Sequence, residues 1–183
     1  TTSTDTTALV WDVSELSKPA PRQSTAQELS VAWTTLAGDG RDAFVAIGTF
    51  VATPDAAVPY LGERVAPAAP LKPPLLAQRI AELKDARFTV REAASKELER
   101  LGESAEAALR KTLEAEKELE PRRRIEAVLE RIRLQKLRDL RAIEALEYIG
   151  SDRAVAVLRR LAAGRTAAAP EAAASLARIG RSK

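Results

Sequence analysis

The sequence predicts an all-α protein, a helical-repeat (α-solenoid) stack of about nine or ten helices with a short extended N-terminal arm. Three observations support this fold class. Alanine supplies 36 of the 183 residues, and it belongs with leucine, glutamate, arginine and lysine among the strongest helix formers. Only seven residues are aromatic, so the core must rely on aliphatic side chains and close alanine contacts. From residue 24 onward, apolar residues recur at helical spacing and glycines follow the ends of these runs.

Two proline clusters divide the chain. They lie at residues 19–21 and 66–74, and clustered prolines favour extended connectors. The sequence therefore predicts four parts: an extended arm or linker over 1–23, an N-terminal helical subunit over 24–65, a proline-rich connector over 66–74 and helical repeats over 75–183.

Caps and turn residues delimit the helices of the first half. A capping box that begins at Thr25 starts the first helix. A second helix starts at residues 39–40 and ends at the turn over 53–55. A third runs to about Val65, and its Pro59 is compatible with a helix only in the first turn, where the backbone N–H has no partner anyway.

The helix signals of the second half follow one another more regularly. In chain order they are a helix to about Lys84, a capping box at Thr89 and Glu92 with a stop at Gly102, a cap at Ser104, a long basic helix that begins near Pro121, a stop at Gly150, a cap at Ser151, and stops at Gly164 and Gly180. The long basic helix carries an apolar stripe that includes Ile125, Val128 and Ile132. Each helix is thus expected to bury one apolar face against its neighbours.

Three stretches of the chain, 43–65, 90–113 and 142–161, resemble one another. Each consists of an apolar helix, a sharp turn and an alanine-rich second helix, and the turns recur after 49 and then 48 residues. Helix pairs of this kind gain stability by stacking on their neighbours. The alternative is an irregular helical bundle without such a stack.

Two segments carry a resemblance to a known repeat family. Residues 82–102, with the run Val90-Arg91-Glu92-Ala93-Ala94 and Leu98, resemble HEAT repeats of the short bacterial type, and residues 145–164 resemble them too. The paired alanines allow two helices to approach closely. This resemblance implies a HEAT-like stack.

The first thirteen residues have a different pattern. Apolar and β-branched residues over 7–13 favour a strand. With the upstream Ser3 and Asp5, the pair Trp11-Asp12 is similar to the closing strand of a WD-repeat propeller blade, where the tryptophan packs between blades. We therefore expect a contact between a propeller and Trp11 and Asp12. An unrelated amphipathic strand or a disordered arm is the alternative.

Together, the strand and the helices resemble the C-terminal region that follows the WD-repeat array in large bacterial WD-repeat proteins. There, a blade ending in Trp-Asp-Val leads into a helical tail with a Val-Arg-Glu-Ala-Ala segment and an arginine-rich helix. The resemblance implies that a propeller lies upstream in the parent protein. It also implies that the helical tail is a non-enzymatic interaction or scaffolding region.

The composition argues against ordinary catalysis. The chain has no cysteine and no histidine, which removes thiolate nucleophiles and the commonest general base and nitrogen metal ligand. It has no glycine-rich phosphate loop, and the alternating glutamates over 114–120 are typical of a solvated segment. We therefore predict no enzyme, no metal and no cofactor.

No apolar run approaches the length of a membrane span, so we expect no membrane contact. The compartment stays unassigned, with the cytoplasm favoured.

Charge is unevenly distributed along the chain. Residues 1–70 have a net charge of −4, and residues 71–183 have a net charge of +7. Arg124, Arg131 and Arg138 recur every seven residues and would form one stripe on a helix, suited to phosphates or carboxylates. The candidate interaction surface consists of Arg122, Arg123, Arg124, Arg131, Arg133, Arg138 and Arg141.

Two functions compete on these observations. The first is a non-enzymatic protein–protein interaction or scaffolding module, whose partner is a protein such as its own upstream propeller. The alternative is anion or nucleic-acid binding through the arginine-rich helix. The same arginines could instead form a solvated helix face with salt bridges to neighbouring glutamates and no binding role. A HEAT-type base-excision enzyme would need an aromatic cleft, and the basic half offers only Phe88 and Tyr148.

Overall fold

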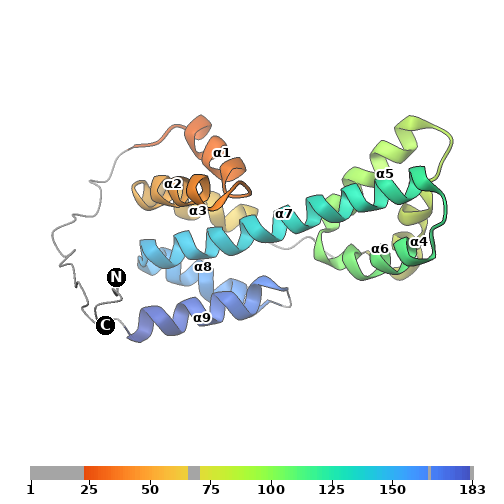
Figure 1. Cartoon of the computed structure of the whole chain (residues 1–183). Helices are drawn as coiled ribbons and strands as arrows, with labels where there is room; N and C mark the ends of the chain where they lie inside the picture. Colours follow the sequence, from red (N-terminus) through yellow and green to blue (C-terminus); the bar gives the residue numbers. More distant parts are fainter. Residues whose placement is uncertain (1–22, 66–70, 165, 182–183) are drawn as a thin grey trace, which may run out of the picture.

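The computed structural model describes residues 23–65, 71–164 and 166–181, and this part of the chain forms nine α-helices and no strand (Figure 1). The helices are α1 (Ala26–Thr35), α2 (Gly40–Val51), α3 (Pro54–Arg64), α4 (Pro73–Glu82), α5 (Phe88–Leu101), α6 (Glu103–Ala115), α7 (Leu119–Ile149), α8 (Asp152–Ala162) and α9 (Ala168–Arg181). The all-α prediction is confirmed for the described residues. The predicted strand at 7–13, with Trp11 and Asp12, lies outside them.

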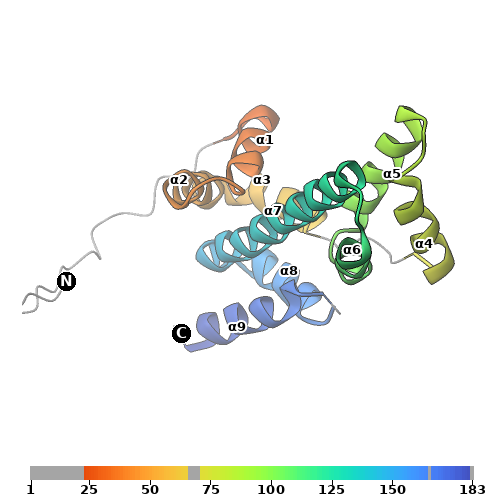
Figure 2. The same cartoon turned by 45° about the vertical axis from the view of Figure 1, so that its right-hand side comes forward.

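The helices form two lobes that α7 joins (Figure 1 and Figure 2). The large lobe consists of α1, α2, α3, α8 and α9 with the C-terminal half of α7, and the small lobe consists of α4, α5 and α6 with its N-terminal half. The fully buried large side chains of the large lobe are Leu36, Phe50, Leu61, Ile143, Leu146 and Leu158. Those of the small lobe are Leu83, Leu98, Leu109, Ile125, Val128 and Ile132.

Both lobes depend on α7, whose 31 residues extend over about 46 Å at 1.5 Å per residue. The predicted apolar stripe with Ile125 and Ile132 packs into the small lobe, and Ile143 and Leu146 pack into the large lobe. The large lobe therefore combines helices from before residue 66 with helices from the end of the chain. Pro73 and Pro74, which the sequence placed in the predicted connector, form the start of α4.

Three helix starts have side-chain caps. The hydroxyl of Thr25 accepts the backbone N–H of Glu28 at 3.2 Å, and the Glu28 carboxylate accepts the N–H of Thr25 at 2.8 Å, which confirms the predicted capping box. The Ser151 hydroxyl caps α8 as predicted, and the Asp39 carboxylate caps α2 by accepting the N–H of Asp42 at 2.9 Å.

Two other predicted caps are wrong. Thr89 is the second residue of α5, because the chain turns earlier: the Asp85 carboxylate accepts the N–H of Arg87 at 2.8 Å, directly before the helix. Ser104 lies in the first turn of α6, because Gly102 (φ 54°, ψ −127°) joins α5 to α6 without any other intervening residue. A backbone conformation that only glycine adopts readily thus replaces the expected loop and cap.

The prediction for Pro59 is also wrong. Pro54 occupies the first turn of α3, so Pro59 lies in the helix interior, where it removes one backbone hydrogen bond. Tertiary contacts compensate for this loss. Leu61 is fully buried, and the Arg160 guanidinium of α8 donates to the carbonyl oxygen of Gly62 at 2.5 Å.

No single helix of the described part is both long and apolar enough to span a membrane. The helices α2 and α3 meet the length and composition only as a pair that is bent by 119°, and both contribute side chains to the core of the large lobe.

Candidate functional site

Arg141 and Arg124 of the candidate surface bind the ends of other helices, and Arg122 makes a longer contact of the same kind, from Nη1 to the carbonyl oxygen of Leu113 in the last turn of α6 at 3.4 Å. Arg141 donates from Nη1 to the carbonyl oxygens of Leu36 and Gly38, at 2.6 and 2.7 Å, just after α1 ends. Arg124 donates from Nη1 to the carbonyl oxygen of Leu83 after α4, at 3.2 Å. Cations are favourable at this end of a helix because the last carbonyl groups have no intrahelical partner. Arg141 and Arg124 therefore connect α7 to both lobes.

Most of the other arginines have carboxylate partners. Arg122 pairs with Glu126 at 3.1 Å and Arg133 with Glu130 at 2.6 Å, both within α7. The hydrogen bond from Arg133 lowers the pKa of the Glu130 carboxyl below its usual range. These pairs are exposed and thus contribute little to the free energy of unfolding.

The remaining members of the predicted stripe also face neighbouring helices. Arg131 forms an ion pair with Glu99 of α5. Arg124, besides its bond to Leu83, forms an ion pair with Glu120 of α7 itself at 2.9 Å. The Arg138 guanidinium lies 5.6 Å from the centre of the Trp33 ring in α1. The heptad spacing does produce one stripe, and the stripe lies where α7 meets α4, α5 and α1.

Arg123 differs from the other six, because no residue in the described part of the chain binds its exposed guanidinium. Among the described residues, Arg123 and Arg133 are the exposed members that make no contact outside α7. The structure therefore divides the candidate surface into arginines that brace the fold and a smaller group that faces outward.

A second candidate surface, which we call the α1–α2 face, was not predicted from the sequence. Phe44 is 74% exposed, Val45 is 63% exposed and Val31 is 56% exposed. A groove of about 290 Å³ runs between the two helices, lined by Val31, Val45 and the smaller side chains Ala32 and Ala46 together with Gln27, Glu28, Thr35 and Thr49. The sequence did contain a signal for it: Phe44 and Val45 are apolar but lie off the buried stripe of Ala43, Ile47 and Phe50.

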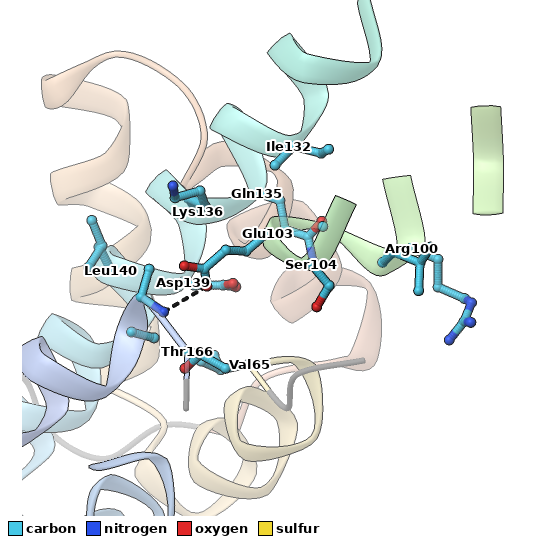
Figure 3. A pocket seen from close by; sticks show the side chains of 14 residues that line it. Val65, Arg100, Glu103, Ser104, Ile132, Gln135, Lys136, Asp139, Leu140 and Thr166 are labelled. Atoms are coloured by element: carbon cyan, nitrogen blue, oxygen red, sulfur yellow. Dashed lines mark hydrogen bonds between the residues drawn. The ribbon is translucent and has the colours of Figure 1, made fainter. Parts of the chain in front are cut away.

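The third feature is a cavity of about 320 Å³ at the junction of the lobes. Its walls come from the α5–α6 turn, from the middle of α7 and from the segment before α9, and Figure 3 shows Glu103, Lys136 and Asp139 around it. The Lys136 ammonium binds the Glu106 carboxylate at 3.0 Å. The Glu103 carboxylate accepts the backbone N–H of Ala167 at 2.7 Å, drawn as the dashed line in Figure 3.

Asp139 has the most perturbed carboxyl group of the described residues. Burial raises its pKa to about 7, and the adjacent Arg138 offsets only part of this effect. Its Oδ1 atom is buried and accepts no hydrogen bond. The sequence did not single out Asp139, because an aspartate between arginines on a basic helix is typical of a solvated face.

Within the described residues, no group of three or more aspartate or glutamate side chains is placed to hold a metal ion. No protein-family model, curated protein or solved structure matches this chain. The HEAT-like and WD-repeat resemblances of the sequence therefore stay predictions.

Proposed function

We propose that this chain is a non-enzymatic protein–protein interaction module, the HEAT-like helical region of a WD-repeat protein, and that its partner is the propeller upstream of it. The observation that carries the proposal is the α1–α2 face. Phe44, Val45 and Val31 are each more than half exposed, on two adjacent helices whose opposite sides are anchored in the core.

An exposed cluster of this kind suits an interface. Large apolar side chains at the surface gain roughly 1.5–3 kcal/mol each when they are fully buried. Phe44 lies beside the groove that Val31 and Val45 line, and large aromatic side chains contribute much of the apolar area that interfaces bury. Glu28, Asp39 and Asp42 lie at the starts of the same two helices, and they would favour a partner with basic groups around its apolar contact.

The location of this surface in the chain also supports the proposal. The helix α1 begins at Ala26, thirteen residues after the end of the WD-like segment at 7–13. A propeller that contains that segment would lie within about 35–45 Å of the α1–α2 face, because the residues between 13 and 26 limit the reach of the connection.

The alternative, anion or nucleic-acid binding through the arginines of α7, has weaker support. Arg124, Arg131, Arg138 and Arg141 are engaged by carboxylates, carbonyl oxygens or an aromatic ring of the same chain. Phosphate binding to them would have to displace those partners. Among the described residues of the candidate surface, Arg123 and Arg133 offer charge without disturbing contacts between helices, because Arg122 also donates to the carbonyl oxygen of Leu113 in α6.

Calorimetric titration of this chain with the separately expressed propeller segment of its parent protein tests the proposal. Phe44→Ser is expected to weaken the binding at least tenfold, because it removes the largest exposed apolar side chain of the α1–α2 face. Phe88→Ser is the matched control, since Phe88 is 67% exposed and lies on the small lobe. Equal affinities of both variants, or no binding of the propeller, contradict the proposal.

A salt series separates the two functions. Binding through the α1–α2 face should weaken only modestly with salt, because the acidic groups lie at the rim of an apolar contact. Binding of oligonucleotides through α7 should fall steeply with salt and weaken strongly when Arg123 and Arg133 are changed to glutamine. These two changes leave the arginines that contact other helices in place, so lost affinity would report on phosphate contacts. That result would favour the alternative function.

A further inference from the structure

The cavity between the lobes exists because α7 is longer than either lobe. Leu101 and Gly102 end α5 on one side of the cavity, and Ala168 starts α9 on the other. Between them, Ile132, Gln135, Lys136, Asp139 and Leu140 of α7 line the cavity, and Figure 3 shows their side chains around it. The volume of about 320 Å³ falls at the lower end of the range for small-molecule sites, which is about 300–1,000 Å³.

The polar chemistry of this cavity is incomplete. Asp139 lines it, and its Oδ1 atom is buried without a hydrogen-bond partner among the described residues. Buried polar atoms in folded proteins almost always have a partner, so an unpaired carboxylate oxygen beside an open volume requires an explanation. A cationic donor in the cavity that reaches the Asp139 carboxylate would supply a hydrogen bond to a side chain whose Oδ1 atom has none among the described residues.

The other charged groups at the cavity already have partners. Arg100 binds Glu97 at 2.8 Å, and Lys136 binds Glu106 at 3.0 Å. Glu103 accepts one backbone N–H and has capacity for further donors. The unsatisfied capacity is therefore on the acceptor side, and it is anionic.

The rest of the wall is mixed: Ser104, Gln135 and Thr166 add neutral polar groups, and the remainder is apolar. Val65, Leu101, Ile132, Leu140 and Ala168 supply aliphatic surface around the two carboxyl groups. A ligand that fits both parts needs a cationic donor group and a short alkyl chain. We propose that the cavity binds an alkylammonium group, which a free amine or a lysine side chain of a partner protein supplies.

The test is a nuclear magnetic resonance titration of this chain with n-butylammonium chloride, with n-butanol as the neutral probe of similar shape. Saturable shifts are expected for residues of the cavity wall with the amine and not with the alcohol. Asp139→Asn should weaken the binding at least about tenfold, since it replaces a charge-assisted hydrogen bond by a neutral one. Shifts that do not saturate, or equal binding of the alcohol, overturn the proposal.

A second substitution in the cavity wall, at Lys136, is expected to raise the affinity for the amine rather than lower it. Lys136→Gln removes the cation three residues before Asp139, so the affinity for butylammonium should rise. Asp55→Asn, at a fully exposed carboxylate in the first turn of α3 that does not line the cavity, should leave the affinity unchanged. If all three variants bind equally, Asp139 does not hold the ligand.

The pH dependence gives an independent readout. Binding requires the ionised Asp139 carboxylate, and its pKa of about 7 means that the ionised fraction rises between pH 6 and pH 8. The affinity should therefore rise about tenfold over that interval in the parent chain and stay flat in Asp139→Asn. The charged groups that face this carboxyl group are Arg138 of its own helix and Arg100, Glu103 and Lys136 around the cavity. A flat profile in the parent chain contradicts the proposal.

Two further probes distinguish the sources of the group. A lysine with both backbone ends blocked should bind as well as butylammonium when a partner's side chain is the natural occupant. A free diamine of similar length should bind better than the blocked lysine when the occupant is a small amine. Either result supports alkylammonium binding. If butylammonium, the blocked lysine and the diamine all fail to bind, the proposal is refuted. The proposed function of the α1–α2 face does not depend on this result.

Discussion

The two halves of α7 lie in different surroundings. In the large lobe, α2, α3, α8 and α9 all pack against the C-terminal half, and its alanines at 142 and 145 are fully buried. In the small lobe, α5 and α6 flank the N-terminal half, and much of its surface carries charged pairs. One helix can thus be a core element at one end and a partly solvated brace at the other. We expect the large lobe to be the more stable of the two.

Removal of a buried isoleucine from each half should have the largest effect and tests this comparison. Ile143→Ala and Ile132→Ala delete the same atoms from positions with almost no solvent exposure. Each should lower the free energy of unfolding by about 2–5 kcal/mol. Ile143→Ala should have the larger effect, because more helices lose contacts. Urea unfolding measures both values.

Hydrogen exchange on the same two variants shows whether the lobes unfold separately. Ile143→Ala should speed exchange in α1, α2, α3, α8 and α9, and Ile132→Ala should speed it in α4, α5 and α6. Equal acceleration in both lobes with either change would mean that α7 couples them into one cooperative unit. In that case the difference between the halves is a matter of burial alone.

Asp139, at the junction, should affect stability in a pH-dependent way. Its raised pKa means that the fold prefers the protonated carboxyl group, so this stability is present below about pH 4 and is lost as the pH rises through about 7. Asp139→Asn should remove that dependence and raise the free energy of unfolding at pH 8 by on the order of 2–4 kcal/mol. Urea unfolding of both chains between pH 4 and pH 8 measures the difference. A variant that is less stable at pH 8 would show that Asp139 has a structural partner.

Two glycine turns offer a matched pair, one in each lobe. Gly102 has φ 54° and ψ −127°, which a side chain rarely adopts, whereas Gly150 has φ 60° and ψ 8° in the left-handed helical region. Gly102→Ala should cost about 2–3 kcal/mol and Gly150→Ala about 1 kcal/mol. A new Cβ at Gly102 would also meet the Gln135 amide at 3.4 Å. Thermal unfolding measures both, and the reverse order would mean that the α5–α6 turn relaxes.

Features set by local sequence were the predictable ones. The capping box at Thr25, the cap at Ser151 and the stripe with Ile125 each depend on residues within one or two turns, and all three are found. The caps at Thr89 and Ser104 were wrong because Asp85 and Gly102 fix the chain before either hydroxyl is reached.

Among the partners of the arginines, too, those close in sequence could be predicted and those far away in sequence could not. Glu120 and Glu126 lie four residues from Arg124 and Arg122, so those pairs are visible in the sequence. The carbonyl oxygens that bind Arg141 are 105 and 103 residues away, and a backbone acceptor leaves no trace in a side-chain pattern. The unpaired, buried Asp139 was equally hidden, because its burial depends on how two lobes meet.

The smallest expected effects compare two arginines of α7, one from each type of contact. Arg141→Gln removes two charge-assisted bonds to the end of α1 from a half-buried side chain, and it should cost about 1–2 kcal/mol. Arg131→Gln breaks an ion pair whose arginine side chain is 59% exposed, and it should cost less than about 0.5 kcal/mol. Urea unfolding at low and high salt measures both.

Salt then separates the two kinds of contact. The effect of Arg131→Gln should vanish at high salt, because counterions screen an exposed pair. The effect of Arg141→Gln should persist, because bonds from a guanidinium to backbone carbonyls depend on geometry and burial as well as on charge. If both effects are small and vanish with salt, α7 does not brace α1 through Arg141. Its arginines could then bind an anionic ligand without breaking contacts that stabilise the fold, and this result would support the alternative function of anion or nucleic-acid binding.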